Sequence, residues 1–131
     1  MTHTLLTGAT GLLGGQLMAD LLEADVALAV LVRPGAGLSG RERIEGILQR
    51  QENDRGRLLP RPVVLEGDLN AERCGLDGER ISWLSRACSR IVHSAASLQF
   101  IGKDRGEEPW RTNVGGTQHV LEVSRAAAIS D

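Results

Sequence analysis

Residues 4–15 read Thr4-Leu5-Leu6-Thr7-Gly8-Ala9-Thr10-Gly11-Leu12-Leu13-Gly14-Gly15. An apolar run, a glycine turn and a leucine-rich segment follow one another, which predicts a buried strand, a tight turn and the start of a helix. In a dinucleotide cradle, Gly8 would allow the turn, Gly11 would let the backbone approach a pyrophosphate, and Gly14 would let the helix pack against the strand. The spacing is G-x-x-G-x-x-G rather than G-x-G-x-x-G, so a glycine-rich turn without a ligand stays open as an alternative.

Strand-like and helical segments alternate along the rest of the chain. Apolar runs predict further strands at residues 26–32, 62–69 and 90–96. Apolar residues at helical spacing predict helices that end near residue 24, cover 41–51 and 76–87, and run from about 110 to 128. This alternation predicts an α/β fold with a parallel sheet in the order 3-2-1-4, the N-terminal part of a Rossmann-type doubly wound sheet.

Three local expectations about the predicted helices follow from their composition. The first helix is expected to bury a face made by Leu12, Leu13, Leu17, Leu21 and Leu22. The second helix is expected to lie on the surface over 41–51 and to be followed by the polar stretch 52–57. Glycine costs about 1 kcal/mol in a helix interior, so we interpret the pair Gly115-Gly116 in the last helix as a site of close packing against the sheet.

Composition limits the classes of function. The chain has 131 residues, of which 41% are hydrophobic, enough for one core. A net charge of −2 with interspersed charges argues against nucleic-acid or membrane partners. No signal-like segment or apolar run of about 18 residues occurs, so we expect a cytoplasmic protein. Cys74, Cys88 and the histidines show no ligand spacing, so we expect free thiols and no metal site.

The residue at the end of the second predicted strand bears on which dinucleotide is bound. NAD-specific proteins of this fold carry an acidic residue there, about 20 residues beyond the glycines, that bonds the ribose 2′-OH. Arg33 takes this place, and no Asp or Glu lies between Asp25 and Glu42. A guanidinium matches a phosphate in a bidentate fork, which favours NADP over NAD. The alternative is that Arg33 only lies along the surface beside the loop.

Two further segments complete the predicted crevice. Asp68 follows the third strand, where its carboxylate and the Leu69 backbone could receive the exocyclic amine of an adenine, although an aspartate that caps a turn fits the pattern as well. Ser94 to Ala96 end the fourth strand, and these small residues would let the backbone approach the ribose and pyrophosphate. His93 beside them is interpreted as structural and not as a catalytic base.

Five segments occur in the order and spacing of extended short-chain dehydrogenases/reductases, which this sequence resembles. They are Thr7 to Gly15, Leu31 to Arg33, Gly67 to Leu69, Ile91 to Phe100, and Asn113 to Thr117. The His-Ser-Ala-Ala run followed by Phe100 is similar to the branch of thioester reductase domains and fatty acyl reductases, the male-sterility type.

The resemblance implies an NADPH-dependent reductase that acts on a carrier- or CoA-bound thioester. It also implies that the three motif glycines, Arg33 and Asp68 contact the cofactor, and that Asn113 is a structural helix residue. The candidate cofactor-site residues are Thr7, Gly8, Thr10, Gly11, Leu12, Leu13, Gly14, Arg33, Asp68, Leu69, Ser94, Ala95, Ala96 and Asn113.

The sequence departs from the family in its catalytic residues. Family members carry a catalytic Ser or Thr and a Tyr-x-x-x-Lys, whereas this chain has no tyrosine and its single lysine is Lys103. We therefore assign no catalytic residue, expect residues 1–131 to be an incomplete NAD(P)-binding domain without the catalytic half, and expect the chain alone to be inactive. The unpaired edge of the fourth strand is expected to promote self-association.

Two other functions stay open. One is a non-catalytic NADP-binding module. The other is the N-terminal half of an NAD(P)-dependent sugar epimerase or dehydratase, against which Arg33 and the His93 segment weigh. Two explanations of the missing catalytic half also stay open. The chain is a fragment of a longer reductase, or it is a natural remnant of one.

Overall fold

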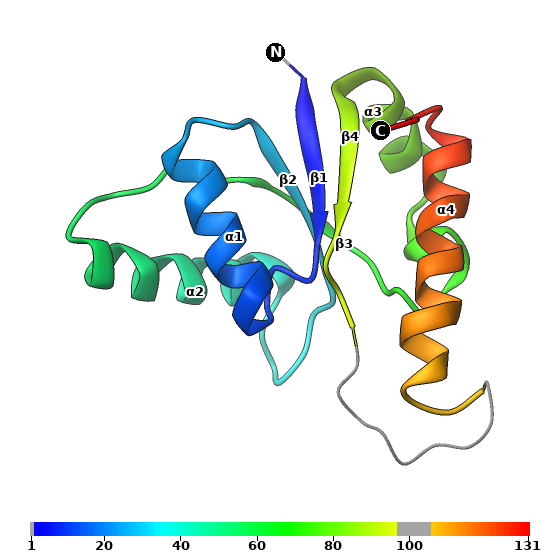
Figure 1. Cartoon of the computed structure of the whole chain (residues 1–131), viewed down its shortest axis with the longest axis horizontal. Coiled ribbons are helices and arrows are strands. Elements are labelled where there is room, and N and C mark those ends of the chain that lie inside the picture. Colours follow the sequence, from blue (N-terminus) through cyan, green and yellow to red (C-terminus); the bar gives the residue numbers. More distant parts are fainter. Residues whose placement is uncertain (1, 97–105) are drawn as a thin grey trace.

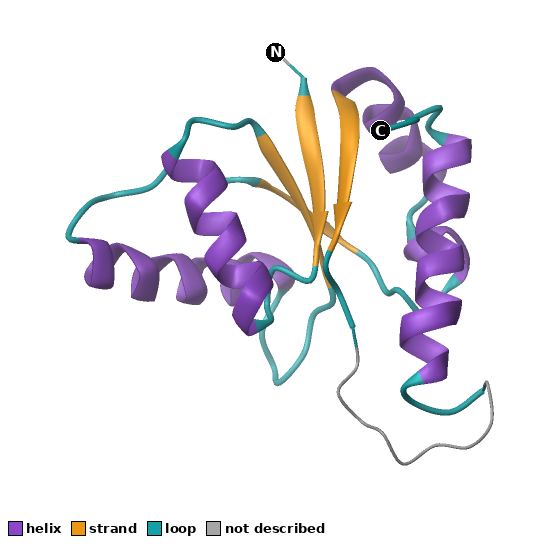
Figure 2. Ribbon diagram, in the orientation of Figure 1, coloured by secondary structure: helices purple, strands orange, loops and turns teal. Residues whose placement is uncertain are grey.

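A computed structural model describes residues 2–96 and 106–131. One parallel sheet in this part of the chain has the order β3-β2-β1-β4 (Figures 1 and 2). Its strands are β1 (His3–Thr7), β2 (Leu28–Val32), β3 (Val63–Glu66) and β4 (Cys88–His93). The predicted α/β class and the strand order of a Rossmann-type sheet are thereby confirmed.

Helices cover both faces of the sheet (Figure 1). Helices α1 (Leu12–Glu23) and α2 (Gly40–Arg55) lie on one face, and α3 (Gly78–Ala87) and α4 (Thr117–Ala126) lie on the other. A 3₁₀ turn, η1 (Glu72–Gly75), follows β3, and a π-helical segment, η2 (Arg111–Gly116), runs directly into α4. The layers therefore alternate helix, sheet, helix, as parallel βα units require.

Each face of the sheet has its own apolar core. The core under α1 and α2 includes Leu6, Val30, Met18, Ile44 and Leu48. The core under α3 and α4 includes Leu5, Leu31, Ile81, Leu84 and Val123. Successive residues of β2 enter opposite cores, and all five of its residues are buried. This is why β2 reads as a continuous apolar run without alternation.

The expected buried face of α1 was wrong at its start. Leu12 is 97% exposed and Leu13 is 74% exposed. The first turn of α1 lies beside the glycine loop at the end of the sheet, where no core covers it. The residues that α1 buries are Gly14, Gly15, Met18, Ala19 and Leu22. Small side chains dominate this face because the helix lies close to the loop and to α2.

Helix α2 is longer than the expected 41–51, because it continues through residues 52–55 of the polar stretch. The helix begins with a capping box between Ser39 and Glu42 and ends at Gly56, whose φ of 68° is left-handed. Glu52 is only 9% exposed because the Arg61 guanidinium and the Leu59 N–H bind its carboxylate. These contacts lower the pKa of Glu52 to about 2, with Arg61 as the largest cause.

The glycine pair before α4 has two different environments. A Cβ on Gly116 would lie 3.4 Å from the Leu69 Cβ, whereas nothing lies within 4 Å of a Cβ on Gly115. Gly116 therefore packs closely against the loop after β3, and the interpretation of the pair as packing against the sheet was wrong.

Candidate functional site

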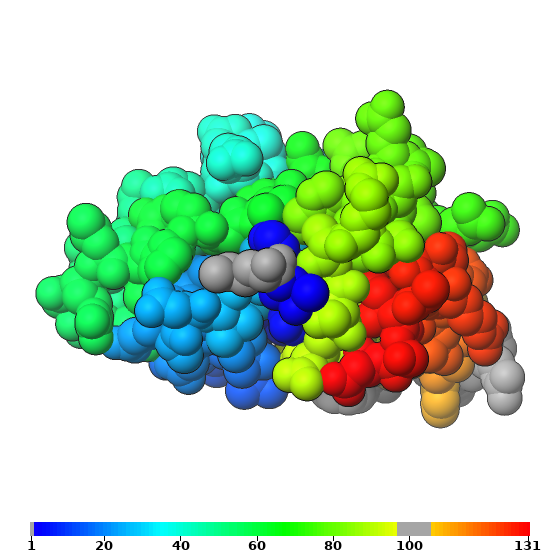
Figure 3. Space-filling view, turned by 90° about the horizontal axis from the view of Figure 1, so that it is seen from above, coloured from blue at the N-terminus to red at the C-terminus, as the bar shows by residue number. Residues whose placement is uncertain are grey.

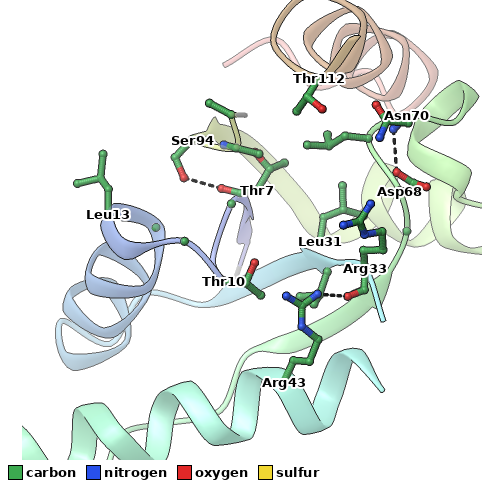
Figure 4. Close-up of a pocket in the computed structure, with 18 of the residues that line it drawn as sticks. Thr7, Thr10, Leu13, Leu31, Arg33, Arg43, Asp68, Asn70, Ser94 and Thr112 are labelled. Atoms are coloured by element: carbon green, nitrogen blue, oxygen red, sulfur yellow. Dashed lines mark hydrogen bonds between the residues drawn. The ribbon is translucent and has the colours of Figure 1, made fainter. Parts of the chain in front are cut away.

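A pocket of about 680 Å³ opens at the carboxyl ends of the strands (Figure 4). It lies where the strand order reverses between β1 and β4, the place at which open α/β sheets bind ligands. The predicted site residues that line it are Thr7, Gly8, Thr10, Gly11, Leu12, Leu13, Gly14, Arg33, Asp68, Leu69, Ser94, Ala95 and Ala96. The structure thus brings these segments together around one cavity.

Asn113 is the predicted site residue that the pocket lining leaves out. It lies in η2, where its backbone carbonyl accepts a hydrogen bond from the Thr117 hydroxyl at 2.7 Å. Phe100 and Lys103 lie outside the described residues.

Sequence reasoning missed several residues of the pocket. These are Leu31, Val32, Arg43, Gly67, Asn70, Glu108, Arg111 and Thr112. Leu31, Val32 and Gly67 are next to predicted site residues in the sequence, so their place in the pocket could have been predicted from those neighbours. Arg43 and the residues from 108 to 112 belong to elements whose position depends on how the helices cross the sheet.

The glycines of the loop serve different purposes. Gly8 has a φ of 82°, and a Cβ there would lie 2.6 Å from the Ala95 nitrogen. A Cβ on Gly14 would lie 1.8 Å from the Gly8 carbonyl oxygen. Both positions therefore admit only glycine for reasons of the fold itself. Gly14 closes on the loop rather than directly on the strand.

Gly11 is not demanded by the fold. It is the N-cap of α1 with an ordinary extended backbone (φ −81°, ψ 172°), and a Cβ there would meet only the Gly8 oxygen at 3.5 Å. A side chain at this position would extend into the pocket that Gly11 lines. The first turn of α1 carries no acidic residue, so its N–H groups and dipole favour an anion at this point.

Two arginines meet at the end of the pocket beside β2. Arg33 follows β2, and Arg43 comes from the second turn of α2 (Figure 4). The Arg43 guanidinium donates a hydrogen bond to the Arg33 backbone carbonyl. The contact ties the loop after β2 to α2 and places two positive charges on this part of the pocket wall.

The loop after β3 is a tight hydrogen-bonded turn. Asp68 Oδ1 accepts from the Asn70 N–H at 2.9 Å, and the Asp68 N–H donates to the Cys74 carbonyl at 2.8 Å. Asp68 therefore does cap a turn, and it also lines the pocket. The Asn70 Oδ1 is a buried acceptor with no partner among the described residues.

His93 bridges β1, β4 and α4 through its two ring nitrogens. Nδ1 lies 2.6 Å from the Thr7 hydroxyl, and Nε2 lies 3.1 Å from the Thr117 hydroxyl. Since the Thr117 hydroxyl donates to the Asn113 carbonyl, its oxygen accepts from Nε2–H, which leaves Nδ1 to accept from Thr7. Burial lowers the pKa of His93, in agreement with this neutral form.

This arrangement has both nitrogens of His93 engaged with protein groups, which fits a structural role. Next to it, the Ser94 hydroxyl donates to the Thr7 carbonyl at 2.6 Å and closes the end of β4 onto β1.

The described residues contain no group of three His, Cys, Asp or Glu side chains that could hold a metal ion. Nor does any helix among them have the length and apolarity needed to cross a membrane.

Comparison with known proteins identifies the family of this chain. The profile described as "Male sterility protein" matches residues 6–129. The adenylate-forming reductase Nps9 of Serpula lacrymans var. lacrymans (strain S7.9) is 31% identical over 131 residues, which cover 98% of this chain and 12% of Nps9.

Solved structures share the fold. The terminal R domain from the myxalamid PKS-NRPS biosynthetic pathway superposes with a TM-score of 0.76 at 27% identity, over 99% of this chain and 33% of that one. The yeast methylglyoxal/isovaleraldehyde reductase Gre2, solved in complex with NADPH, has a TM-score of 0.71 at 16% identity over 97% of this chain and 34% of Gre2, a likeness of fold alone. The chain thus spans about a third of these structures, and with the profile matched over nearly all of its length it belongs to the male sterility protein family.

Proposed function

We propose that this chain is the NADP(H)-binding part of a reductase that acts on a thioester or fatty acyl group held by a carrier protein or by CoA. The observation that carries the proposal is Gly11, where the fold has room for a side chain but glycine leaves the backbone at the start of α1 open to the pocket. Membership of the male sterility protein family supports the reductase assignment. So does the similarity to the adenylate-forming reductase Nps9.

The residues of the pocket fit the pyrophosphate, a ribose and the adenine of a dinucleotide. The N–H groups at the start of α1 would bind the pyrophosphate, and Ser94 to Ala96 would let the ribose approach β4. One carboxylate oxygen of Asp68 accepts from Asn70, and the other would accept from the adenine amine. Bound NADPH supplies the hydride. With no tyrosine in the sequence, we propose that the group that protonates the product comes from outside residues 1–131.

NADP rather than NAD is proposed because of the two arginines. Arg33 and Arg43 both line the pocket beside the end of β2, where the 2′ position of the adenosine ribose would lie. A phosphate monoester there would gain charge-assisted hydrogen bonds from the guanidinium groups, and a 2′-hydroxyl would not.

The test is calorimetric titration of the wild-type protein with NADPH and NADH. We expect a preference for NADPH that Arg33→Ala reduces by about 10-fold or more, since hydrogen bonds to charged groups contribute roughly 1.5–3 kcal/mol. NADH affinity should stay unchanged. Arg50→Ala on the exposed side of α2 is the matched control and should alter neither affinity. Equal affinities of the wild type for NADPH and NADH would show that the two arginines do not select NADP.

A cytoplasmic location is part of the proposal. Cys74 and Cys88 are both buried free thiols, as a reducing compartment maintains. Burial raises the pKa of Cys74 to about 12 and that of Cys88 to about 11, so both thiols stay protonated and unreactive.

We also propose that the outer edge of β4 pairs with a second copy of this chain. The C-terminal residues lie beside β4 (Figure 3), where the Ile91 N–H donates to the Asp131 carbonyl at 2.9 Å and Arg90 pairs with the Asp131 carboxylate at 2.8 Å. Among the described strands, β1 is the one that pairs with β4, so the rest of its outer edge presents backbone groups.

Sedimentation velocity over a wide range of concentrations should show reversible dimerisation. A wild-type chain that stays monomeric at every concentration would contradict this part of the proposal.

A further inference from the structure

Three contacts join α4 and the end of η2 to the loop after β3. Gly116 packs against Leu69, the His119 Nδ1 lies 2.5 Å from the Leu69 carbonyl oxygen, and Glu122 accepts from the Arg73 N–H at 3.0 Å. Leu69 lines the pocket, whereas His119 does not. Helix α4 therefore holds in place a loop that belongs to the pocket wall.

The chemistry of the His119 contact is unambiguous. A carbonyl oxygen only accepts hydrogen bonds, so the proton must lie on Nδ1 of His119. Both partners are partly buried, which limits competition from water.

The loop needs such an external tie because its own backbone is strained. Arg73 and Cys74 have left-handed φ values of 50° and 57°, which non-glycine residues rarely adopt, and Gly75 continues in the same region with a φ of 69°. The Cys74 carbonyl in this turn accepts the Asp68 N–H. The strained turn and the pocket residue Asp68 are thus one connected unit, and α4 fastens it at both ends.

We propose that His119 is a positioning residue for the adenine end of the bound nucleotide, acting through the Leu69 carbonyl. The proposal rests on the proposed function, because it takes Asp68 and Leu69 as the adenine-binding wall. His119 itself touches neither the nucleotide nor the reacting atoms.

Three substitutions of His119 separate positioning from packing. Asn places its amide nitrogen where the imidazole has Nδ1, Gln carries the amide nitrogen one bond farther out, and Leu has no donor. We expect His119→Leu and His119→Gln to weaken NADPH binding by about 10-fold, the effect of one lost hydrogen bond, and His119→Asn to stay within about 2-fold of the wild type. Gln118→Leu, at the exposed neighbouring position, is the control and should not change the affinity.

Adenosine 2′,5′-bisphosphate provides the second readout, because it carries only the adenosine half of NADPH. Its affinity should fall by the same factor as that of NADPH in the Leu and Gln variants. Titration calorimetry measures both ligands, and thermal melting measures the stability of each variant.

The outcomes distinguish the inference from the proposed function. A wild-type protein that does not bind NADPH would defeat the proposed function. A wild-type protein that binds NADPH, with a leucine variant that binds equally well, would overturn only the role of His119. If the leucine variant does not fold, Asn and Gln decide, and equal affinities of these two variants would overturn the inference.

Discussion

Adding one methyl group at position 14 should prevent the chain from folding stably. In Gly14→Ala, the new Cβ would lie 1.8 Å from the Gly8 carbonyl oxygen and 2.5 Å from the Gly8 carbonyl carbon. Both are backbone atoms of the loop between β1 and α1, so no flexible side chain can move aside. We expect a loss of more than about 3 kcal/mol, beyond the usual cost of overpacking a core. Thermal melting followed by circular dichroism measures it.

Gly46→Ala is the matched control for this prediction. Gly46 lies inside α2, and the nearest atom to a Cβ there is the Arg50 guanidinium at 3.9 Å. The same substitution should therefore raise stability by roughly 0.5–1 kcal/mol, the helix preference of alanine over glycine. If the Gly14 and Gly46 variants melted alike, the close approach of α1 to the glycine loop would be wrong.

Valine at position 11 should leave the fold intact and abolish nucleotide binding. The backbone of Gly11 is extended, which a β-branched residue adopts readily, and Gly11 provides no side-chain cap to lose. A stability change of about 1 kcal/mol or less is expected at this N-cap position. The valine side chain would, however, occupy the pocket at the start of α1, where the pyrophosphate must approach. We expect NADPH affinity to fall by at least about 100-fold.

Titration calorimetry and thermal melting on the same Gly11→Val preparation provide the test. A variant that melts like the wild type and binds NADPH as tightly would show that the ligand does not use this loop. A variant that fails to fold would contradict the space that the structure gives to position 11.

Local sequence patterns were sufficient for most of the fold. The run of apolar residues in β2, the turn at Gly8 and the helical spacing of the apolar residues in α2 depend on neighbours a few residues away. Parallel strands joined by helices have a fixed hand and few possible orders, so the alternation together with the glycine motif of a Rossmann-type sheet predicted the order 3-2-1-4. The same reasoning predicted that the glycine loop and Asp68 would meet at the carboxyl ends of the strands.

Only the tertiary structure decided which helix faces are covered and which distant residues join the pocket. Leu12 and Leu13 fit the apolar period of α1 but lie beyond the edge of the core. Arg43 reaches the pocket because α2 crosses beside the end of β2, and Glu52 continues the helix because Arg61 returns to bind it. His119 meets Leu69 across fifty positions of sequence. These contacts depend on how separate elements pack in space. The periodicity of apolar residues along one segment carries no information about that packing.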